Sequence, residues 1–320
     1  MSPRDDLKIF SCNGNPDLAR KVCECLGEPL GDAPITRFPD GEINVKINED
    51  IRGRDIFIIQ PTCPPVNENL MELLIVVDAA RRSSARRITA VMPYYGYARK
   101  DRKDEGRVPI TAKLVANMLV EAGVDRVLAL DLHATQIQGF FDIPVDHLFS
   151  APVLSGYFRE MNLPNLVVAS PDVGGIRMAR AFASWLNAGL AVVDKRRISP
   201  EESSAGFVIG DVKGKNVLLV DDMITTGGSL TNAAQALREY GAREVYAAAA
   251  HAILVGAAVE KLKSSVLKEV MVTDSVPATE KLKQIGGRVK ALTVSKLLAE
   301  AVRRIHVNES VSSLFMNQNH

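Results

Sequence analysis

Two adjacent carboxylates and a turn of small residues are the part of the chain whose residue types most clearly suggest chemistry. Asp221 and Asp222 follow Val217–Val220, an apolar run short enough for a buried parallel strand. After the acids come the turn residues Thr225, Thr226, Gly227, Gly228 and Ser229, and then an amphipathic segment, Leu230–Tyr240. The pattern predicts a strand that ends at the acidic pair, a turn, and a helix.

A turn of this kind at the start of a helix can bind an anion. Its backbone N–H groups converge on one place, and the helix dipole adds partial positive charge there. The ionised side chains of Asp221 and Asp222 only accept hydrogen bonds, so they suit the two O–H donors of a vicinal diol. A phosphate beside a diol describes a ribose 5-phosphate. The alternative is that the acids cap a turn and the glycines merely connect a strand to a helix.

The composition limits the class of protein. The 320 residues are 47% hydrophobic, which is enough for a large core, and the length suggests two domains. Lys plus Arg number 39 against 38 for Asp plus Glu, so no overall field draws the chain to nucleic acid or to an anionic membrane. The charged amino end does not fit a signal peptide, and the longest apolar stretch, Val245–Val259, is interrupted by His251. We therefore expect a soluble cytoplasmic protein.

The cysteines do not indicate a metal site or a redox motif. Cys12, Cys23, Cys25 and Cys63 match neither a CxxC pair nor the spacing of metal ligands. We expect four free thiols in a reducing compartment and no zinc.

Short apolar runs alternate with amphipathic segments along the chain. Strands are expected near Ile56–Ile59, Arg87–Met92, Val127–Leu130, Leu166–Ala169, Ala191–Val193, Asn216–Val220 and Val245–Ala250. Helices are expected at Leu70–Arg82, Ile110–Glu121 and Leu230–Tyr240. The alternation predicts an α/β fold with mainly parallel sheets.

A faint internal repeat indicates two copies of one design. His133 and His251 each lie ten residues after a glycine, Gly123 or Gly241, that follows a predicted helix. The same offset in the sequence aligns the turn at 225–229 with Arg107–Thr111. No acidic pair precedes Arg107–Thr111, so only the second copy keeps the phosphate turn. We place the domain boundary near residue 150, which gives domains 1–150 and 151–320, and the last residues could pack back on the first domain.

Two stretches could bind a nucleotide. Phe38–Glu42 contains a Pro-Asp-Gly core that predicts a hairpin turn, and beyond that ordinary role Phe38 could stack on a purine whose exocyclic amine donates to the acids. Met92–Lys103 is rich in tyrosine and ends in cations that include Arg99 and Lys100. Such a mixture could bind RNA or single-stranded DNA. The chain has only 5% aromatic residues and no second patch of this kind, which favours a single nucleotide polyphosphate.

Two further stretches could act on a bound polyphosphate. His133 and Asp172 each follow a predicted strand, where open α/β sheets bind ligands. Each has an ordinary structural role as its alternative, but together they could share Mg²⁺, with the histidine contact made through water. The segment Asp194–Gly206 carries Lys195 and Arg197 and is either a solvated surface loop or a lid that brings both cations over the polyphosphate.

These six stretches together closely resemble the bacterial type of ribose-phosphate pyrophosphokinase, from about Lys8 to Phe315. The resemblance implies two tandem phosphoribosyltransferase-like domains, each a mainly parallel sheet flanked by helices. It also implies Mg²⁺-dependent transfer of the diphosphoryl group of ATP to the 1-hydroxyl of ribose 5-phosphate, which gives AMP and 5-phosphoribosyl 1-diphosphate for nucleotide biosynthesis.

The resemblance further implies a role for each matching residue. ATP is contacted by Phe38, Asp40, Gly41, Glu42, Arg99 and Lys100; the Mg²⁺ site is served by His133 and Asp172; Lys195 and Arg197 are catalytic; and ribose 5-phosphate is bound by Arg197, Asp221, Asp222, Thr225, Thr226, Gly227, Gly228 and Ser229. A homohexamer is implied, in which the Phe38 turn reaches a neighbouring subunit's site. Arg52, Ser84, Ser310 and Ser312 match the family's site for the effectors phosphate and ADP.

Three residues depart from the family pattern. Lys100 stands where the family usually has Gln, Asp50 where it usually has Ser, and Thr225 where it usually has Asp. Threonine at position 225 is typical of true phosphoribosyltransferases, so an enzyme that uses phosphoribosyl diphosphate is one alternative. A catalytically silent regulatory relative is another, although such a relative would be expected to lose lid or metal residues that this chain keeps.

Overall fold

The computed structural model describes residues 6–194 and 207–314, which fold into two compact α/β units. The first unit comprises the chain up to Phe149 and again from Thr293, and the second comprises Ser150–Leu292. The predicted lid residues Lys195 and Arg197 lie outside the described residues. In the described part of the chain, no helix has an apolar stretch long enough to cross a bilayer.

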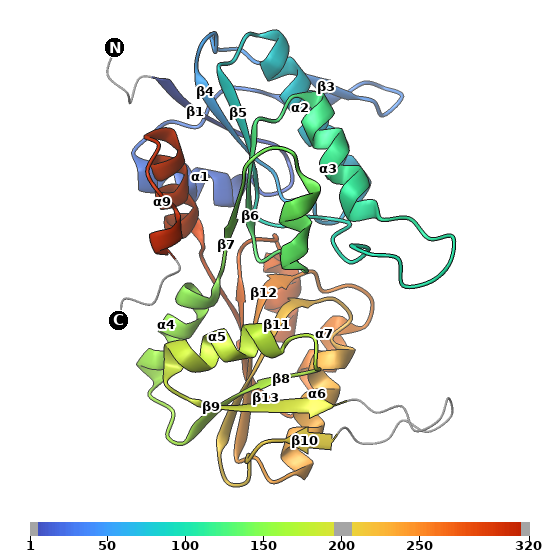
Figure 1. The fold of residues 1–320 in the computed structure, drawn as a ribbon, viewed down its shortest axis with the longest axis vertical. Helices are drawn as coiled ribbons and strands as arrows, with labels where there is room; N and C mark the ends of the chain where they lie inside the picture. Colours follow the sequence, from blue (N-terminus) through green and yellow to red (C-terminus); the bar gives the residue numbers. More distant parts are fainter. Residues whose placement is uncertain (1–5, 195–206, 315–320) are drawn as a thin grey trace. The chain divides into compact units, whose positions relative to one another are not determined.

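The first unit is built on a five-stranded parallel sheet with the strand order β1-β4-β5-β6-β7 (Figure 1). Its strands are β1 (Leu7–Ser11), β4 (Asp55–Ile59), β5 (Arg87–Met92), β6 (Arg126–Leu130) and β7 (Val145–Leu148). One face packs on α1 (Pro16–Leu26) and α9 (Ser295–His306), and the other on α2 (Val66–Arg82), α3 (Thr111–Ala122) and the 3-10 helix η2 (Thr135–Phe140).

Strand β4 shows why both faces are covered. Its residues are all buried, with Ile56 and Ile58 in the core on the α2 side and Phe57 and Ile59 in the core on the α1 and α9 side. Successive side chains of a strand point to opposite faces, so an uninterrupted apolar run requires helices on both.

The second unit is built on a seven-stranded sheet with the order β10-β9-β8-β11-β12-β13-β14, in which only β10 and β9 pair antiparallel. The strands are β8 (Leu166–Ser170), β9 (Gly189–Asp194), β10 (Phe207–Ile209), β11 (Asn216–Ile224), β12 (Glu244–Ala252), β13 (Leu267–Thr273) and β14 (Val289–Leu292). Helices α4 (Ala151–Met161) and α5 (Ile176–Leu186) pack on one face, and α6 (Gly228–Glu239), α7 (Ala258–Ser264) and α8 (Thr279–Ile285) on the other.

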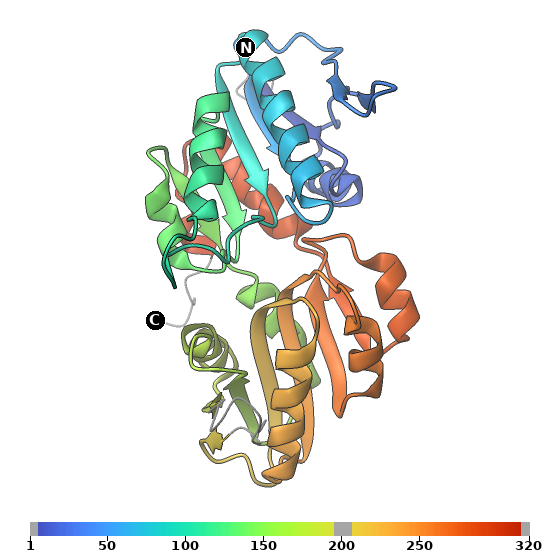
Figure 2. The same ribbon diagram turned by 90° about the vertical axis from the view of Figure 1, so that its right-hand side faces the viewer.

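Two short elements lie outside the sheets. Strands β2 (Ile35–Arg37) and β3 (Ile43–Val45) form an antiparallel hairpin that projects from the first sheet beside α2 (Figures 1 and 2). A 3-10 turn, η3 (Ser312–Leu314), ends the described chain. The predicted α/β fold with two mainly parallel sheets is thus confirmed.

The prediction that a strand ends at the acidic pair is wrong. Strand β8 pairs with β11 only as far as Ala169 opposite Leu219, whereas β12 continues to Ala252 opposite Ile224. Asp221 and Asp222 therefore lie on an extension of β11 that is paired on one side only. Helix α6 also begins earlier than predicted, at Gly228 instead of Leu230.

The two histidines of the internal repeat differ in their surroundings. His251 lies inside β12, is buried, and has its Nδ1 2.9 Å from Oγ of Ser275. His133 lies beyond the end of β6 and is exposed. The repeat therefore describes the two chain paths but not a common role for the histidines.

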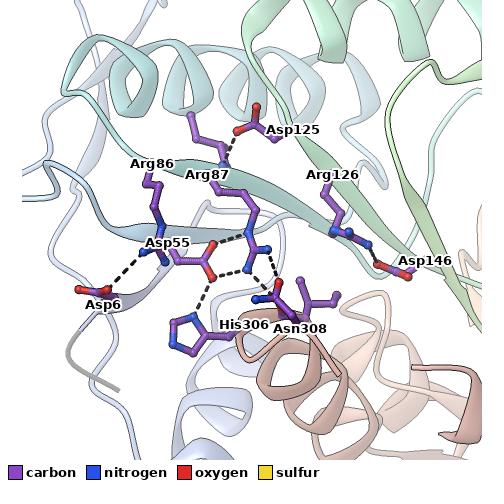
Figure 3. Close-up of polar contacts among 11 residues, drawn as sticks. Asp6, Asp55, Arg86, Arg87, Asp125, Arg126, Asp146, His306 and Asn308 are labelled. Carbon is purple, nitrogen blue, oxygen red and sulfur yellow. Dashed lines mark hydrogen bonds and ion pairs between the residues drawn. The ribbon is translucent and has the colours of Figure 1, made fainter. Parts of the chain in front are cut away.

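Asp55 joins the last turn of α9 to the amino ends of β4 and β5 (Figure 3). Its buried carboxylate accepts from Nε of Arg87 at 2.8 Å and lies 2.7 Å from Nδ1 of His306. Nη2 of Arg87 also donates to the carbonyl of Ile305 at 3.0 Å. These contacts, with the packing of α9 on α1, place the segment from Thr293 in the first unit.

Candidate active site

Asp221 and Asp222 form a closely spaced carboxyl pair near the end of β11. Both side chains are half-buried, and Oδ1 of Asp221 accepts from the backbone N–H of Asp222 at 2.9 Å. Burial, and after it the charge of Asp222, raise the pKa of Asp221 to about 8. Because this environment disfavours a second negative charge, a hydroxyl donor or a cation beside the pair would lower its energy.

The turn after the pair leads directly into α6. Gly227 is the N-cap residue, has φ +75°, and makes no side-chain capping hydrogen bond. A β-carbon is strained at this φ, which explains a glycine here. The first N–H groups of a helix have no partner within it, and they lie at the positive end of its dipole. The structure therefore places the predicted turn at a helix start, and its role in phosphate binding stays a prediction.

Lys261 of α7 adds a cation to this turn. Its Nζ lies 3.5 Å from the place that a β-carbon on Gly228 would take, and it forms no ion pair with any residue that the structure describes. The connection after β12 holds this arrangement, since Val255 N–H donates to the carbonyl of Thr225 at 2.8 Å. Sequence reasoning missed Lys261 because no motif or spacing connects it to the turn.

Asp172 lies in the same unit, after β8, and is exposed. Its Oδ1 accepts from the backbone N–H of Gly175 at 3.1 Å, and its carbonyl accepts from Oγ of Ser170 at 2.6 Å. Its charge contributes in a small way to the raised pKa of Asp221. Asp172 thus interacts electrostatically with the carboxyl pair. Even so, in residues 6–194 and 207–314 no three His, Cys, Asp or Glu side chains are arranged to hold one metal ion.

His133 belongs to the first unit, where it follows β6 and precedes η2. Its exposed side chain lies close to the carboxyl end of a parallel strand, as predicted. The shared Mg²⁺ contact of His133 and Asp172 stays a prediction, because the two residues are in different units.

The stretch Phe38–Glu42 forms the predicted hairpin turn between β2 and β3. Phe38 N–H donates to the carbonyl of Glu42 at 2.8 Å, Gly41 N–H donates to the carbonyl of Phe38 at 2.9 Å, and Asp40 Oδ1 accepts from Glu42 N–H at 3.1 Å. Gly41 has φ +95°, and half of the Phe38 surface is exposed (50%). The turn therefore presents an aromatic ring and two acids to solvent.

Lys100 is not an isolated cation. Its Nζ lies 3.0 and 2.9 Å from the two carboxylate oxygens of Asp104, and this hydrogen bonding raises the pKa of Lys100. The preceding Arg99 is exposed. Because Asp104 neutralises part of the lysine charge, the departure from the usual glutamine at position 100 changes the local charge less than the sequence alone suggests.

The four predicted effector residues are held as two separate pairs in the first unit. Nη1 of Arg52 donates to Oγ of Ser84 at 3.1 Å, and Ser312 N–H donates to Oγ of Ser310 at 3.3 Å. Asp50 uses its Oδ1 to accept from the backbone N–H of Arg52 at 3.1 Å. The structure thus brings Arg52 and Ser84 together, and their effector role stays a prediction.

Comparison with known proteins identifies relatives along the whole chain. Residues 7–123 match a family model described as the N-terminal domain of ribose phosphate pyrophosphokinase, and residues 196–316 match the phosphoribosyl synthetase-associated domain. A ribose-phosphate pyrophosphokinase of Chlorobaculum tepidum is 56% identical over 98% of this chain and 96% of its own length. A relative of the same name from Haemophilus influenzae is 53% identical over 97% of this chain and 99% of its own length.

A solved structure agrees with these relatives. The phosphoribosylpyrophosphate synthetase from Mycobacterium smegmatis superposes with a TM-score of 0.89 at 42% identity, covering 95% of this chain and 99% of that one. The likeness extends over both units and both sheets.

Proposed function

The chain belongs to the ribose-phosphate pyrophosphokinase family and is an enzyme, and from this premise we propose that it transfers the β,γ-diphosphoryl group of ATP to the 1-hydroxyl of ribose 5-phosphate. The products are AMP and 5-phosphoribosyl 1-diphosphate, a precursor for nucleotide biosynthesis. The observation that carries the proposal is the end of β11, where a closely spaced carboxyl pair is followed, after Met223 and Ile224, by a helix-start turn.

Ribose 5-phosphate is the substrate that this arrangement suits. The 5-phosphate would accept from the N–H groups and hydroxyls of residues 225–229 at the positive end of α6. The two ring hydroxyls would donate to Asp221 and Asp222, which offsets the unfavourable burial of their charge. Held at both ends, the sugar would present its 1-hydroxyl in a fixed direction.

ATP is the proposed diphosphoryl donor. We assign Phe38, Asp40, Gly41 and Glu42 to the adenine and Arg99 and Lys100 to the polyphosphate, following the family resemblance. Lys195 and Arg197 are the proposed catalytic residues of a lid. Transfer of an anionic group along a line of oxygens depends mainly on positioning and on neutralising charge, which these cations would supply.

Mg²⁺ is the proposed cofactor. Asp172 offers carboxylate oxygens of the kind that Mg²⁺ prefers, and a cation nearby would offset the burial and neighbouring charge that raise the pKa of Asp221. Because no three acidic or histidine side chains of the described residues surround one point, the ion would keep much of its water. His133 in the first unit and Asp172 in the second are its proposed contacts. When bound, Mg²⁺ would neutralise charge on the polyphosphate. The protein groups would hold the two substrates and keep the reacting oxygens in line.

We further propose a homohexameric assembly, with phosphate as an activator and ADP as an inhibitor at the Arg52 and Ser84 pair together with Ser310 and Ser312. The guanidinium and hydroxyl at 3.1 Å support an anion at the first pair, because both groups can donate to a phosphate oxygen.

One incubation tests the reaction. The protein is mixed with ATP, Mg²⁺ and ribose 5-phosphate, and the products are followed by phosphorus NMR. We expect AMP and 5-phosphoribosyl 1-diphosphate in equal amounts. Formation of ADP instead would indicate transfer of a single phosphoryl group and contradict the proposal. Inert ATP in this incubation, together with consumption of phosphoribosyl diphosphate and a free nucleobase in a second incubation that supplies both, would favour a phosphoribosyltransferase.

A further inference from the structure

We propose that Arg37, acting with Glu68 and Glu72, positions the β2–β3 hairpin for adenine recognition, an inference that rests on the function proposed above. The hairpin projects from the first sheet (Figures 1 and 2), and its strands pair over three positions, from Ile35 with Val45 to Arg37 with Ile43. A two-stranded hairpin of this length is not stable by itself in water. The direction of its turn must therefore be fixed by contacts with the rest of the unit.

Arg37 makes the contacts that connect the turn to α2. It is the last residue of β2, and its Nη1 donates to the carbonyl of Gly41 at 3.1 Å, inside the turn. Its Nη2 donates to Oε2 of Glu68 at 2.6 Å and lies 4.0 Å from Oε1 of Glu72. We call these three contacts the hairpin clamp. A planar guanidinium with five N–H donors can satisfy all of them at once, which a lysine ammonium cannot do in the same geometry.

Glu72 gives the clamp a fixed end. Its side chain is 3% exposed and accepts from the backbone N–H of Asn13 at 3.0 Å, from the side-chain amide of Asn13 at 3.0 Å, and from Nε2 of Gln60 at 3.3 Å. Gln60 in turn accepts from the N–H of Gly14 at 2.8 Å. Gln60 directly follows the end of β4, and Asn13 lies two residues after the end of β1. A buried carboxylate held by several donors keeps its place, so the cation paired with it is also restrained.

The clamp and the proposed adenine contacts lie on the same short turn. Phe38 follows Arg37 directly, and Gly41, whose carbonyl Arg37 binds, separates Asp40 from Glu42. Stacking and amine recognition both depend on where the turn points. Arg37 is therefore a positioning residue. Its loss should weaken the binding of ATP and the preference for adenine, and should leave ribose 5-phosphate binding unchanged.

Steady-state kinetics of matched variants test the clamp. For Arg37→Ala we expect KM for ATP to rise about tenfold, KM for ribose 5-phosphate to stay within about twofold, and the ratio of kcat/KM for ATP over GTP to fall. Arg37→Lys should lie between this variant and the wild type. Arg20→Ala is the control, since it removes an exposed arginine paired with Asp17 on α1, away from the hairpin, and should match the wild type.

A second variant tests the same contacts from α2. The half-exposed Glu68 can be changed to Gln with little risk to folding, so Glu68→Gln serves if Arg37→Ala fails to fold. If the clamp acts as a unit, the double variant that combines Arg37→Ala with Glu68→Gln should bind ATP no more weakly than Arg37→Ala alone. An unchanged KM for ATP in folded Arg37→Ala, or equal losses for ATP and ribose 5-phosphate, would overturn the proposal.

Failure of the proposed function would be visible separately, because the wild type would then form no phosphoribosyl diphosphate. In that case calorimetric titration of each variant with ATP alone still tests the clamp. A dissociation constant for ATP that is about tenfold larger in Arg37→Ala than in the wild type supports the clamp, and equal constants contradict it.

Discussion

The burial that raises the pKa of Asp221 lowers the stability of the folded protein when no ligand is bound. The carboxyl of Asp221 holds a proton more tightly in the folded chain, with a pKa near 8, than in an unfolded chain, where about 4 is usual. Between these two values the folded state binds more protons, so stability falls as pH rises. Above about pH 8 both states have lost the proton and the cost is constant. Such unfavourable burial is typical of sites that bind a cation or a hydroxyl donor.

Removing that charge should stabilise the free protein. Asp221→Asn keeps an oxygen that can accept from Asp222 N–H, and it lacks the buried charge. We expect a gain in unfolding free energy of about 1 to 3 kcal/mol at pH 9 and almost none at pH 4. Thermal unfolding of both proteins across this pH range, without Mg²⁺ or substrate, measures the difference. A variant that is less stable than the wild type at pH 9 would show that the carboxylate is compensated within the fold.

Lys261 should contribute to ribose 5-phosphate binding. Its ammonium lies by the start of α6, where the 5-phosphate is proposed to bind, but it is exposed and therefore screened by water and salt. We expect Lys261→Ala to raise KM for ribose 5-phosphate by about three- to tenfold and to leave KM for ATP unchanged. Lys263→Ala is the matched control on α7, since residues two apart on a helix face different directions. Equal KM values for Lys261→Ala and the wild type would remove the lysine from the site.

At the scale of the element, one buried carboxylate decides how firmly α9 is held. Asp55 is fully buried and serves both Arg87 of β5 and His306 of α9 (Figure 3). Removing one partner of a buried ion pair leaves the other without compensation, which costs about 3 to 5 kcal/mol. In Asp55→Asn, this loss of stability should affect the last turn of α9 as well as the strands.

Hydrogen exchange can separate these two effects. We expect Asp55→Asn to destabilise the first unit by about 3 kcal/mol and to raise amide exchange selectively in α9. Asp146→Asn is the control, because Asp146 pairs with Arg126 between β7 and β6 and forms no hydrogen bond or ion pair with the described residues of α9 (Figure 3). It should lower stability without a selective effect on the helix. Equal exchange of α9 in the two variants would contradict the role given to Asp55.

Patterns within single elements predicted much of the fold. Apart from Thr89, the run Arg87–Met92 is apolar after its first residue, and its observed bounds are those predicted, because a short buried run is typical of a parallel strand that is covered on both faces. The end of β11 could not be predicted in this way. The strand continues through two acids because β12 runs beside it as far as Ala252, and that pairing is set by tertiary structure. The early start of α6 was not predicted because Gly227 and Gly228 have low helix propensity, so the sequence there does not indicate the beginning of a helix.

At the scale of the whole molecule, residues far apart in sequence meet in ways that local patterns do not contain. The predicted turn at 225–229 and the hairpin turn at 38–42 were recognisable because each is continuous in sequence. Lys261 and the Glu72 end of the hairpin clamp were not, because their partners lie more distant along the chain. The partial neutralisation of Lys100 by Asp104 was missed for another reason. The two residues are four apart in a loop, and whether they form an ion pair depends on how that loop folds.

The proposed effector site is a further case in which distant segments matter, since Arg52 and Ser84 meet although strand β4 and helix α2 lie between them in the sequence. Asp50 accepts from the backbone N–H of Arg52 and is exposed, so its negative charge stands beside the pair that is proposed to bind phosphate. A carboxylate in that place repels an anion, and we expect phosphate activation to be weak while inhibition by ADP persists.

Asp50→Ser should therefore strengthen activation by phosphate. A serine hydroxyl can accept from the N–H two residues later as the aspartate does, so the turn should be kept while the charge is removed. We expect the phosphate concentration for half-maximal activation to fall by about threefold or more, with KM values for ATP and ribose 5-phosphate unchanged. Initial rates across a phosphate titration at fixed Mg²⁺, with and without ADP, measure this. Strong activation of the wild type that Asp50→Ser does not increase would show that the carboxylate does not oppose the effector.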